Sequence, residues 1–424
     1  MNILVVGSGG REHALVWRLL ACDSTTQVYA VPGNPGIAME ASCIPGAMGS
    51  PAEIVSLAET LAVDLTVVGP EAPLVEGLAD AFDARKLPIV GPSKFDAQLE
   101  GSKVFAKQFM RENGIPTAAF AVVETMADLE QHIDAFGFPV ALKADGLAAG
   151  KGVVLVKDKK EGLEIGRTML AGKLVGEAGR RLVIEEFLRG EEVSFIVLSD
   201  GKSFFSFAPT QDHKAAFDND EGPNTGGMGA YCVDSILDDQ ARATILDRIV
   251  EPTLSALRKQ GHPYRGFLYF GLMMTAEGPK LLEYNVRLGD PETQPLMYRM
   301  TGDFARLLAS AAKGALDTSL VGWAPGATAC VVLASGGYPG AYPTGMPITG
   351  IPAADSATSK VFHAGTLLQE GKLVTSGGRV LGVTASGATL QQAIGRAYEA
   401  AARIYFEGMH FRRDIGQKGL RRQL

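Results

Sequence analysis

The first hundred residues alternate between short apolar runs and longer stretches in which apolar residues recur at helical spacing. A short apolar run bounded by Gly and Pro is typical of a strand, and the longer spacing predicts a helix. Strands that alternate with helices favour an open parallel sheet with helices on both faces. We therefore predict an α/β domain over residues 1–103, with strands at 3–6, 28–31, 65–68 and 88–90 and helices up to residue 20 and near 52–61.

The pattern after residue 91 mixes helices and strands and continues to about residue 325. One helix is predicted over 94–113, since Gly114, Ile115 and Pro116 follow it as a stop signal. Gly and Pro within 321–328 indicate a boundary. Beyond it we expect a small α+β cap over 326–424 that contains a helix at 390–405. The strands predicted after residue 91 are 140–143, 153–156, 182–185, 192–198, 266–274, 280–285, 329–333 and 379–384.

Composition limits the class of protein further. The chain has 424 residues, of which 46% are apolar and 21% charged, enough for roughly two to four domains with buried cores. Its net charge of −7 offers no basic surface for nucleic acid or an anionic membrane. No apolar stretch approaches the ~20 residues that span a bilayer. The cysteines lie far apart without a CxxC pair, as in a reduced cytosolic protein, and no targeting signal precedes the first strand. We expect a cytoplasmic protein.

The turn Gly7-Ser8-Gly9-Gly10 lies between a predicted strand and a predicted helix. Such a turn binds anions well, because glycines let the backbone approach a phosphate and the helix N-terminus offers free N–H groups. The dinucleotide fingerprint is incomplete, since Glu12 stands at the third glycine and Pro32-Gly33-Asn34 replaces the ribose-binding acid. A small phosphate ligand is therefore favoured over a dinucleotide. The alternative is a tight turn with no ligand.

Glu71 follows Gly69-Pro70 at the end of the third predicted strand, at the edge where open α/β sheets bind ligands. Its carboxylate is suited to accept hydrogen bonds from sugar hydroxyls. The signal is weak by itself, because most exposed glutamates are merely solvated.

A glycine-rich loop follows the strand that ends at Lys143. It is not a Walker A loop, because the glycine spacing is too short and Gly152 stands at the Ser/Thr position. A loop of this kind can still close over a triphosphate through backbone amides and lysines, although it can also be plain surface. The candidate phosphate contacts are Lys143, Gly146, Gly150, Lys151 and Gly152.

Two carboxylates flank the connector after the strand at 182–185. An adenine needs backbone donors and acceptors from such a hinge, and a ribose needs a nearby carboxylate. Glu185 and Glu192 suit these tasks.

The strongest chemical signal lies at the end of the strand at 280–285. Glu283 and Asn285 are two residues apart, so that their side chains point to one face of the strand. A carboxylate and an amide carbonyl on one face suit Mg²⁺, with waters and ATP phosphates as the other ligands. Arg287 continues this face and is suited to hold a carboxylate or an acyl phosphate.

At these residues the chain resembles an ATP-grasp enzyme. Lys103, Lys143 with its loop, Glu185, Glu192 and Glu283-x-Asn285 occur in the order that this superfamily shows. Within it, nearly the whole chain resembles the phosphoribosylamine–glycine ligase family. The motifs that carry this resemblance are 7–13, 32–36, 211–214, 223–229, 287–294, 406–408 and 413–416.

The resemblance implies an α/β and α+β multidomain protein. It implies an N-terminal substrate-binding domain at 1–103, an ATP-grasp domain at 104–325 with an inserted lid at about 118–187, and a C-terminal α+β domain at 326–424. The implied substrates are ATP, glycine and 5-phosphoribosylamine, with Mg²⁺ or Mn²⁺ as the metal. We expect a monomer or a weak homodimer.

The resemblance also implies a reaction through glycyl phosphate and a role for each motif. Lys103, Lys143 and the metal neutralise the triphosphate, and Arg287 the acyl phosphate. Glycine and the acyl phosphate are held by Asp212 to Lys214 and by Asn224, Thr225, Gly226 and Gly227. Gly9, Gly10, Arg11 and Arg379 take the ribose 5-phosphate, and Glu71 the ribose hydroxyls. Asp212 and Asp290 are candidates for a general base, so that the catalytic set is Arg287, Asp212, Lys214 and Asp290.

Two positions depart from the family pattern. Ala215 stands where many members have arginine, and Gly271 stands where many ATP-grasp enzymes have a further acidic metal ligand. The first has no assigned role, and the second puts a tightly held second metal in doubt.

Three rival functions stay open at this point. They are a relative that activates formate or bicarbonate, an NAD-dependent oxidoreductase built on the N-terminal sheet, and a nucleotide-binding protein without turnover.

Overall fold

The computed structural model describes residues 1–46, 48–147, 152–173 and 176–422. The N-terminal region forms a five-stranded sheet in the order β3-β2-β1-β4-β5, and every strand pair is parallel, as predicted. The core strands are buried on both faces because helices cover both, which explains their continuous apolar runs. The elements are β1 (Asn2–Gly7), α1 (Gly10–Leu20), β2 (Gln27–Pro32), α2 (Pro35–Ala38), β3 (Ser42–Cys43), α3 (Pro51–Thr60), β4 (Leu65–Val68), α4 (Glu71–Glu76), α5 (Leu78–Ala84) and β5 (Ile89–Val90).

The single helix predicted over 94–113 is wrong. Two helices, α6 (Gln98–Gly101) and α7 (Lys103–Glu112), replace it. Ser102 is extended between them, and its hydroxyl accepts the Phe105 N–H at 3.1 Å and donates to Asp145 Oδ1 at 2.8 Å. A serine that caps a new helix has a local alternative to continuing the old one, which the periodicity does not reveal.

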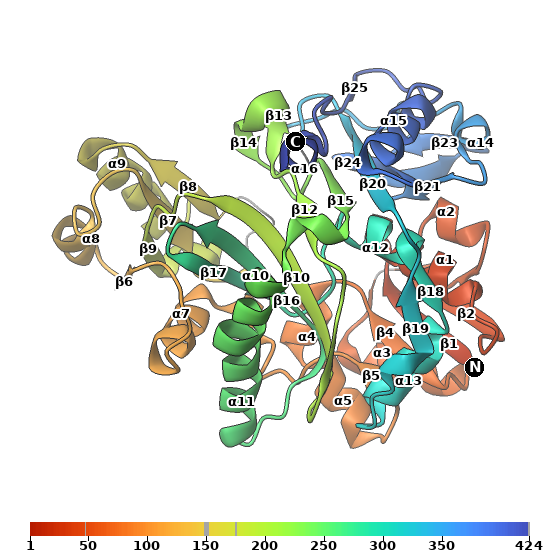
Figure 1. Ribbon diagram of the computed structural model, residues 1–424, viewed down its shortest axis with the longest axis horizontal. Helices are drawn as coiled ribbons and strands as arrows, with labels where there is room; N and C mark the ends of the chain where they lie inside the picture. The colour runs from red at the N-terminus through yellow and green to blue at the C-terminus, as the bar shows by residue number, and fades with distance from the viewer. Residues whose placement is uncertain (47, 148–151, 174–175, 423–424) are drawn as a thin grey trace.

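A separate four-stranded antiparallel sheet, in the order β6-β9-β7-β8, lies at the left of Figure 1. It has its own apolar cluster, which includes Leu129, Leu142 and Ile184. β7 and β8 pair as a hairpin around the predicted glycine-rich loop. The elements are β6 (Phe120–Val123), α8 (Met126–His132), β7 (Val140–Ala144), β8 (Val153–Val156), α9 (Lys159–Leu170) and β9 (Leu182–Glu186).

A ten-stranded sheet crosses the middle of the molecule in the order β17-β16-β10-β12-β15-β20-β24-β21, with β11 on β10 and β25 on β20. Its strands are β10 (Glu191–Asp200), β11 (Phe204–Ser206), β12 (Thr210–Asp212), β15 (Gly229–Cys232), β16 (Arg265–Thr275), β17 (Gly278–Asn285), β20 (Ala327–Ser335), β21 (Ser359–His363), β24 (Arg379–Gly387) and β25 (Met409–His410). β15 pairs along its whole length with β20, so this sheet continues across the predicted boundary near residue 325.

The remaining elements are hairpins and helices on this sheet. The hairpins are β13 (Ala215–Phe217) with β14 (Glu221–Asn224) and β22 (Thr366–Gln369) with β23 (Lys372–Thr375). A further antiparallel pair, β18 (Met300–Gly302) with β19 (Val321–Trp323), is joined through an intervening helical segment. The helices are α10 (Asp239–Ile245), α11 (Glu251–Lys259), α12 (Thr293–Arg299), α13 (Phe304–Ala312), α14 (Ile351–Ala354), α15 (Leu390–Ala401) and α16 (Gln417–Arg422).

The stretch 321–328, interpreted as a boundary, contains β19 and the start of β20, and the boundary itself stays a prediction. One expectation near the C-terminus needs correction. The helix predicted over 390–405 ends at Ala401, because the N–H and C=O of Tyr405 pair with the backbone of Thr349 instead. A residue whose backbone joins a β-bridge cannot also continue a helix.

One apolar cluster joins the N-terminal sheet to the large sheet. It includes Leu15 of α1, Phe267 of β16, Phe304 at the start of α13 and Phe362 of β21. This packing brings the carboxyl edge of the N-terminal sheet against the end of β17 and fixes where a shared site can form.

Candidate active site

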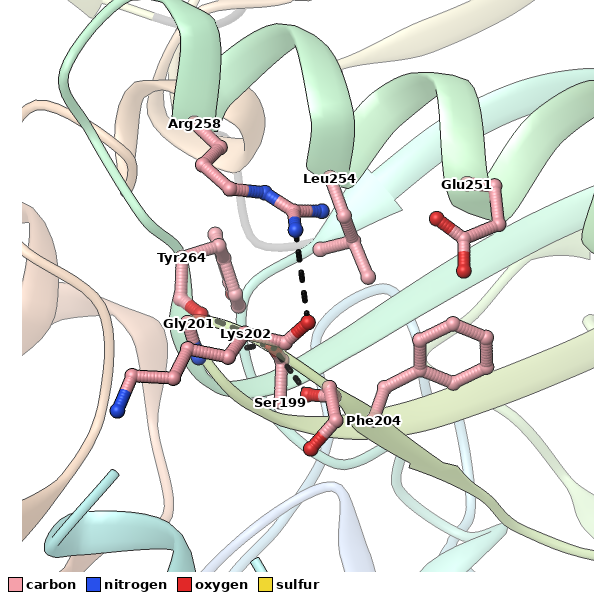
Figure 2. Close-up of a pocket in the computed structure, with 9 residues that line it drawn as sticks. Ser199, Gly201, Lys202, Phe204, Glu251, Leu254, Arg258 and Tyr264 are labelled. Carbon is pink, nitrogen blue, oxygen red and sulfur yellow. Dashed lines mark hydrogen bonds between the residues drawn. The ribbon is translucent and has the colours of Figure 1, made fainter. Parts of the chain in front are cut away.

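The small cavity in Figure 2 lies between the turn after β10 and helix α11. Its volume is about 10 Å³, enough for one water molecule. Arg258 donates there to the carbonyl of Lys202 at 3.5 Å. None of the predicted site residues lines it, so the candidate site lies elsewhere, where the sheets meet.

The first group of predicted residues surrounds a buried carboxylate. Glu185 at the end of β9 is only 2% exposed, and its Oε2 lies 2.9 Å from Lys143 Nζ and 3.1 Å from Lys107 Nζ. Burial lowers the pKa of Lys107 to about 8, against the opposing effect of Glu185. The sequence reasoning missed Lys107, although its position four residues after Lys103 on a helix places both on one face. In this arrangement Glu185 orients Lys143.

Lys103 at the start of α7 donates to the carbonyl of Gly146 at 3.3 Å. The helix that follows the N-terminal sheet therefore reaches the glycine-rich loop between β7 and β8. Of the predicted loop residues, Gly150 and Lys151 lie outside the described residues. Gly152 closes the hairpin, since its carbonyl accepts the Ala144 N–H at 2.7 Å.

The predicted metal ligands lie beside a lysine. Lys214 Nζ is 3.6 Å from Glu283 Oε1 and 3.3 Å from Glu192 Oε2. Burial opposes ionisation of Glu283, but Lys214, Lys143 and Lys103 outweigh it and lower its pKa to about 2. Asn285 presents Oδ1 to Arg287 Nη2 at 3.0 Å.

The donor set fits a divalent ion that other ligands complete. Within the described ranges, no three His, Cys, Asp or Glu side chains are placed to hold a metal by themselves. Burial raises the pKa of Asp212, and Glu292, Glu192 and Glu283 raise it further against Lys214, so several carboxylates share this part of the site with the lysines. A hard ion with few protein oxygens and several water or phosphate ligands is the chemistry of Mg²⁺.

The structure gives a physical reason for glycine at position 271. Gly271 pairs with Glu283 across β16 and β17. A Cβ at this position would lie 3.1 Å from Glu283 Cγ, so a larger side chain would crowd the carboxylate.

Arg287 lies between two carboxylates, one of which the sequence analysis missed. Its Nη2 is 2.8 Å from Glu100 Oε1, and its Nε is 3.3 Å from Glu71 Oε2. Burial raises the pKa of Glu100 against the effect of Arg287. Glu100 also accepts the Val286 N–H at 2.7 Å and so fixes the chain just before Arg287. No local signal marks Glu100, which lies in α6.

The N-terminal glycine turn is partly occupied by the protein's own carboxylate. The Gly9 N–H donates to Glu12 Oε2 at 2.5 Å, and a Cβ at Gly69 would lie 2.0 Å from Glu12 Oε1. Glu12 thus fills the space between the ends of β1 and β4. Arg11 is buried and binds Glu12 Oε1 at 2.7 Å and the carbonyl of Leu288 at 3.1 Å. Its guanidinium therefore serves internal partners that link α1 to the loop after β17.

Asp290 connects the glycine turn to Arg379. A Cβ at Gly9 would lie 3.5 Å from Asp290 Oδ2 and one at Gly10 3.8 Å from Oδ1. Arg379 Nη2 is 3.3 Å from Asp290 Oδ2, and Gln294 donates to Oδ1 at 2.9 Å. Burial opposes ionisation, but Arg379 and Arg11 outweigh it and lower the pKa of Asp290. Residues more than three hundred positions apart in the sequence meet here.

The two predicted glycine-binding segments also meet. Thr225 donates through Oγ1 to the carbonyl of Lys214 at 2.8 Å and accepts the Gly227 N–H at 2.9 Å. Asn224 ends β14 opposite Ala215 and is exposed. Arg379 Nη1 donates to the Gly226 carbonyl at 2.7 Å.

The C-terminal motif at 413–416 supports these segments from outside the site. The Gly416 N–H donates to His213 Nε2 at 3.2 Å, and burial lowers the pKa of His213 to about 4, so this histidine is neutral at pH 7. Arg412 is fully buried, binds Asp414 and Asp220, and donates to the carbonyl of Ala215. The motif thus anchors the β13–β14 hairpin that separates the two segments.

Family models match most of the chain in three consecutive parts. They are the N domain of phosphoribosylglycinamide synthetase at residues 1–100, its ATP-grasp (A) domain at 101–293 and its C domain at 328–418.

Curated relatives extend over the full length. The phosphoribosylamine–glycine ligase of Vibrio cholerae is 47% identical over 100% of this chain and 99% of its own, and that of Escherichia coli is 46% identical over 100% of both.

Solved structures agree with these matches. The crystal structure of phosphoribosylamine–glycine ligase from Thermotoga maritima has a TM-score of 0.85 and 36% identity, and the match covers 98% of this chain and 100% of that one. The biotin carboxylase domain of 2-oxoglutarate carboxylase from Hydrogenobacter thermophilus has a TM-score of 0.74 at 17% identity, over 97% and 91% of the two chains. The second match shows a shared fold.

The fold and the site define an ATP-grasp ligase, an enzyme class that uses ATP with a divalent metal. Within this class the matches are specific across all three parts of the chain. The chain belongs to the phosphoribosylamine–glycine ligase family. Among the described residues, no helix combines the length and apolar character needed to cross a membrane.

Proposed function

We propose that this enzyme joins glycine to 5-phosphoribosylamine at the expense of ATP, giving glycinamide ribonucleotide, ADP and phosphate, the second step of de novo purine synthesis. One observation carries the proposal. The Asp290–Arg379 pair lies beside the glycine turn, where we expect the phosphate of the acceptor to bind. Lys214 lies beside Glu283, where we expect the metal to bind. The segment 224–227 contacts both Arg379 and Lys214 and so connects the two places. Family membership supports the choice of substrates.

The reaction proceeds through glycyl phosphate. The carboxylate of glycine attacks the γ-phosphorus of ATP and ADP leaves. The amine of phosphoribosylamine then attacks the acyl carbon, phosphate leaves, and the amine loses a proton. Each step moves negative charge between fixed positions, so alignment and charge placement account for most of the catalysis.

On the nucleotide side, Lys103 and Lys143 neutralise the phosphates and Glu185 orients Lys143. Gly146, Gly150, Lys151 and Gly152 form the loop that covers the triphosphate, and Glu192 serves the ribose. Glu283 and Asn285 are the protein ligands for Mg²⁺ or Mn²⁺. When bound, this ion supplies charge neutralisation on the phosphate oxygens.

On the acceptor side, the glycine turn at Gly9 and Gly10 and the side chain of Arg379 hold the 5-phosphate, and Glu71 holds the ribose hydroxyls. Arg11, whose guanidinium is bound to Glu12 and to the carbonyl of Leu288, supports this turn from inside. Arg287 holds the acyl phosphate. Asp212, Lys214 and the segment Asn224–Thr225–Gly226–Gly227 position glycine. Asp212 and Asp290 are the candidates to take the proton from the amine, and Asp290 is ionised at pH 7 because Arg379 and Arg11 lower its pKa.

The proposed division into domains follows these roles. Residues 1–103 bind the phosphoribosyl group, 104–325 bind ATP with a lid at about 118–187, and 326–424 close the acceptor side. The enzyme works in the cytoplasm on small molecules and needs no nucleic acid or membrane. We propose a monomer or a weak homodimer.

The test is ADP release by the wild type and by Glu283→Ala with glycine and freshly made phosphoribosylamine. We expect turnover to require both substrates and to fall at least ~100-fold in the variant, since a lost metal ligand removes several kcal/mol of charge stabilisation.

Formate or bicarbonate in place of glycine serves as the control. Turnover with either, or no turnover with glycine, would contradict the substrate assignment. Full activity of Glu283→Ala would contradict the metal site alone.

A further inference from the structure

Tyr338 lies in a turn after β20 that the sequence analysis did not single out. The turn is fixed at several points, since the Tyr338 N–H donates to the Ser335 carbonyl at 3.1 Å and the Ser335 hydroxyl donates to the Gly377 carbonyl at 2.9 Å. The Tyr338 ring packs so closely against Gly378 that a Cβ at position 378 would lie 2.1 Å from ring atom Cδ2. Gly378, which directly precedes Arg379, therefore makes room for this ring.

The Tyr338 hydroxyl contacts the proposed glycine-binding segment. It accepts the Gly226 N–H at 3.1 Å. The carbonyl of the same Gly226 accepts from Arg379 Nη1 at 2.7 Å. Two side chains of the C-terminal region thus hold both polar backbone groups of one glycine.

This double contact leaves the segment little freedom. Arg379 Nη1 also donates to the Asp290 carbonyl at 2.6 Å, and a Cβ at Gly227 would lie 2.4 Å from the Pro291 ring. Gly227 has a φ of +116°, a conformation that an L-residue rarely adopts. Since a flexible glycine pair costs conformational entropy to order, an external contact that orders it in advance favours ligand binding.

We propose that Tyr338 is a positioning residue for the amino-acid substrate. Its hydroxyl holds Gly226 in the geometry in which the 224–227 segment receives glycine. This inference rests on the proposed function, because it takes that segment to be the glycine site. Lys103, Lys143 and Glu185, which lie on other elements, serve the nucleotide. Tyr338 therefore affects the binding of glycine and not the binding of ATP.

The test compares Tyr338→Phe with the wild type in ADP release at varied glycine and at varied ATP. Losing one hydrogen bond to a segment that must be ordered is expected to raise the KM for glycine about fivefold to tenfold. The KM for ATP should stay within about twofold and the melting temperature within about 2 °C, because the ring still packs on Gly378. Tyr342→Phe is a matched control, since Tyr342 contacts the Tyr338 ring edge-on but forms no hydrogen bond among the described residues.

A second variant tests the same contact from the other side. Gly378→Ala moves the Tyr338 ring although the residue keeps its hydroxyl group, so the hydroxyl no longer reaches the Gly226 N–H and the KM for glycine should rise in the same way. An unchanged KM for glycine in Tyr338→Phe would overturn the inference, as would a parallel rise for ATP with a lower melting temperature, which marks a purely structural role. Wild-type turnover without any need for glycine would instead sink the proposed function.

Discussion

At the scale of single residues, the site consists of charges that are each matched by a partner from a distant part of the chain. Arg287 is matched by Glu100 and Glu71, and Lys143 by Glu185. Burying a charge without a partner costs several kcal/mol, so the two members of each pair have to be buried together. Arg287, Lys143 and Glu185 can be found in the sequence because they lie in recognisable motifs. Their further partners Glu100 and Lys107 cannot, because an isolated Glu or Lys on a helix has no local signature.

The two lysines on Glu185 are expected to behave differently. Lys143→Met should lower kcat/KM for ATP about 10-fold to 100-fold, the range expected when a charged hydrogen bond is lost. Lys107→Met should lower the melting temperature more than the activity, because Lys107 is buried on α7 and also donates to Thr117 at 2.6 Å. Steady-state kinetics with thermal melting of both variants measures this. An equal loss of kcat/KM in Lys107→Met at an unchanged melting temperature would mean that Lys107 contacts the nucleotide.

At the scale of elements, the β13–β14 hairpin shows how a weak local structure is stabilised from outside. Its strand residues are largely exposed, and a two-stranded hairpin is marginal by itself. The C-terminal segment supplies what the hairpin lacks. The Asn219 N–H donates to Asp414 Oδ2 at 2.9 Å, the Arg413 N–H donates to Asp218 Oδ1 at 2.7 Å, and Arg412 binds Asp220 at 3.0 Å.

Arg412 is the residue on which this anchoring depends most. Arg412→Met should lower the free energy of unfolding by about 2 kcal/mol, because it removes the charged hydrogen bonds to Asp414 and Asp220 and the bond to the carbonyl of Ala215, while Lys418 still binds Asp220. Urea unfolding measures the loss. Arg413→Met is the control, since Arg413 is exposed and its guanidinium lies over the Phe411 ring, so a change below ~1 kcal/mol is expected. Equal losses in the two variants would contradict the anchoring role.

At the scale of the whole molecule, the N-terminal and C-terminal regions are joined by a polar contact as well as by the apolar cluster. Lys360 Nζ lies 2.6 Å from Glu40 Oε1, His13 Nε2 lies 3.6 Å from the same oxygen, and Asn34 donates to the His363 carbonyl at 2.9 Å. Burial opposes the ionisation of Glu40, but His13 and Lys360 outweigh it and lower its pKa to about 2.

This contact should make stability depend on pH in a defined window. A carboxyl whose pKa is about 2 in the folded protein and near its ordinary value when unfolded adds stability that is complete above about pH 5 and declines as the pH falls toward 2. Glu40→Gln should therefore cost about 1–2 kcal/mol at pH 7, and the difference from the wild type should shrink at pH 3.5. Urea unfolding at pH 7, 5 and 3.5 measures both. A difference that stays constant over this range would show that Glu40 contributes by packing.

Local patterns predicted much of the fold. The parallel N-terminal sheet and the strands of the central region follow from apolar periodicity, which depends only on neighbours in the chain. The prediction of a single helix over 94–113 was wrong because Ser102 caps the start of a second helix. The prediction that the last long helix continues to residue 405 was wrong because Tyr405 forms a β-bridge with Thr349, a contact between residues far apart in the chain.

The sequence by itself determined the parallel N-terminal sheet, the main strands of the central region, the glycine turn and the motifs that identify the family, since these depend on residue type and spacing. Only the tertiary structure decided which charges pair, that β20 continues the central sheet, and that Tyr338 and Arg379 hold Gly226. The physical reason is that a buried charge or a free N–H specifies the kind of partner it needs but not where in the chain that partner lies. Packing of the whole molecule supplies the location.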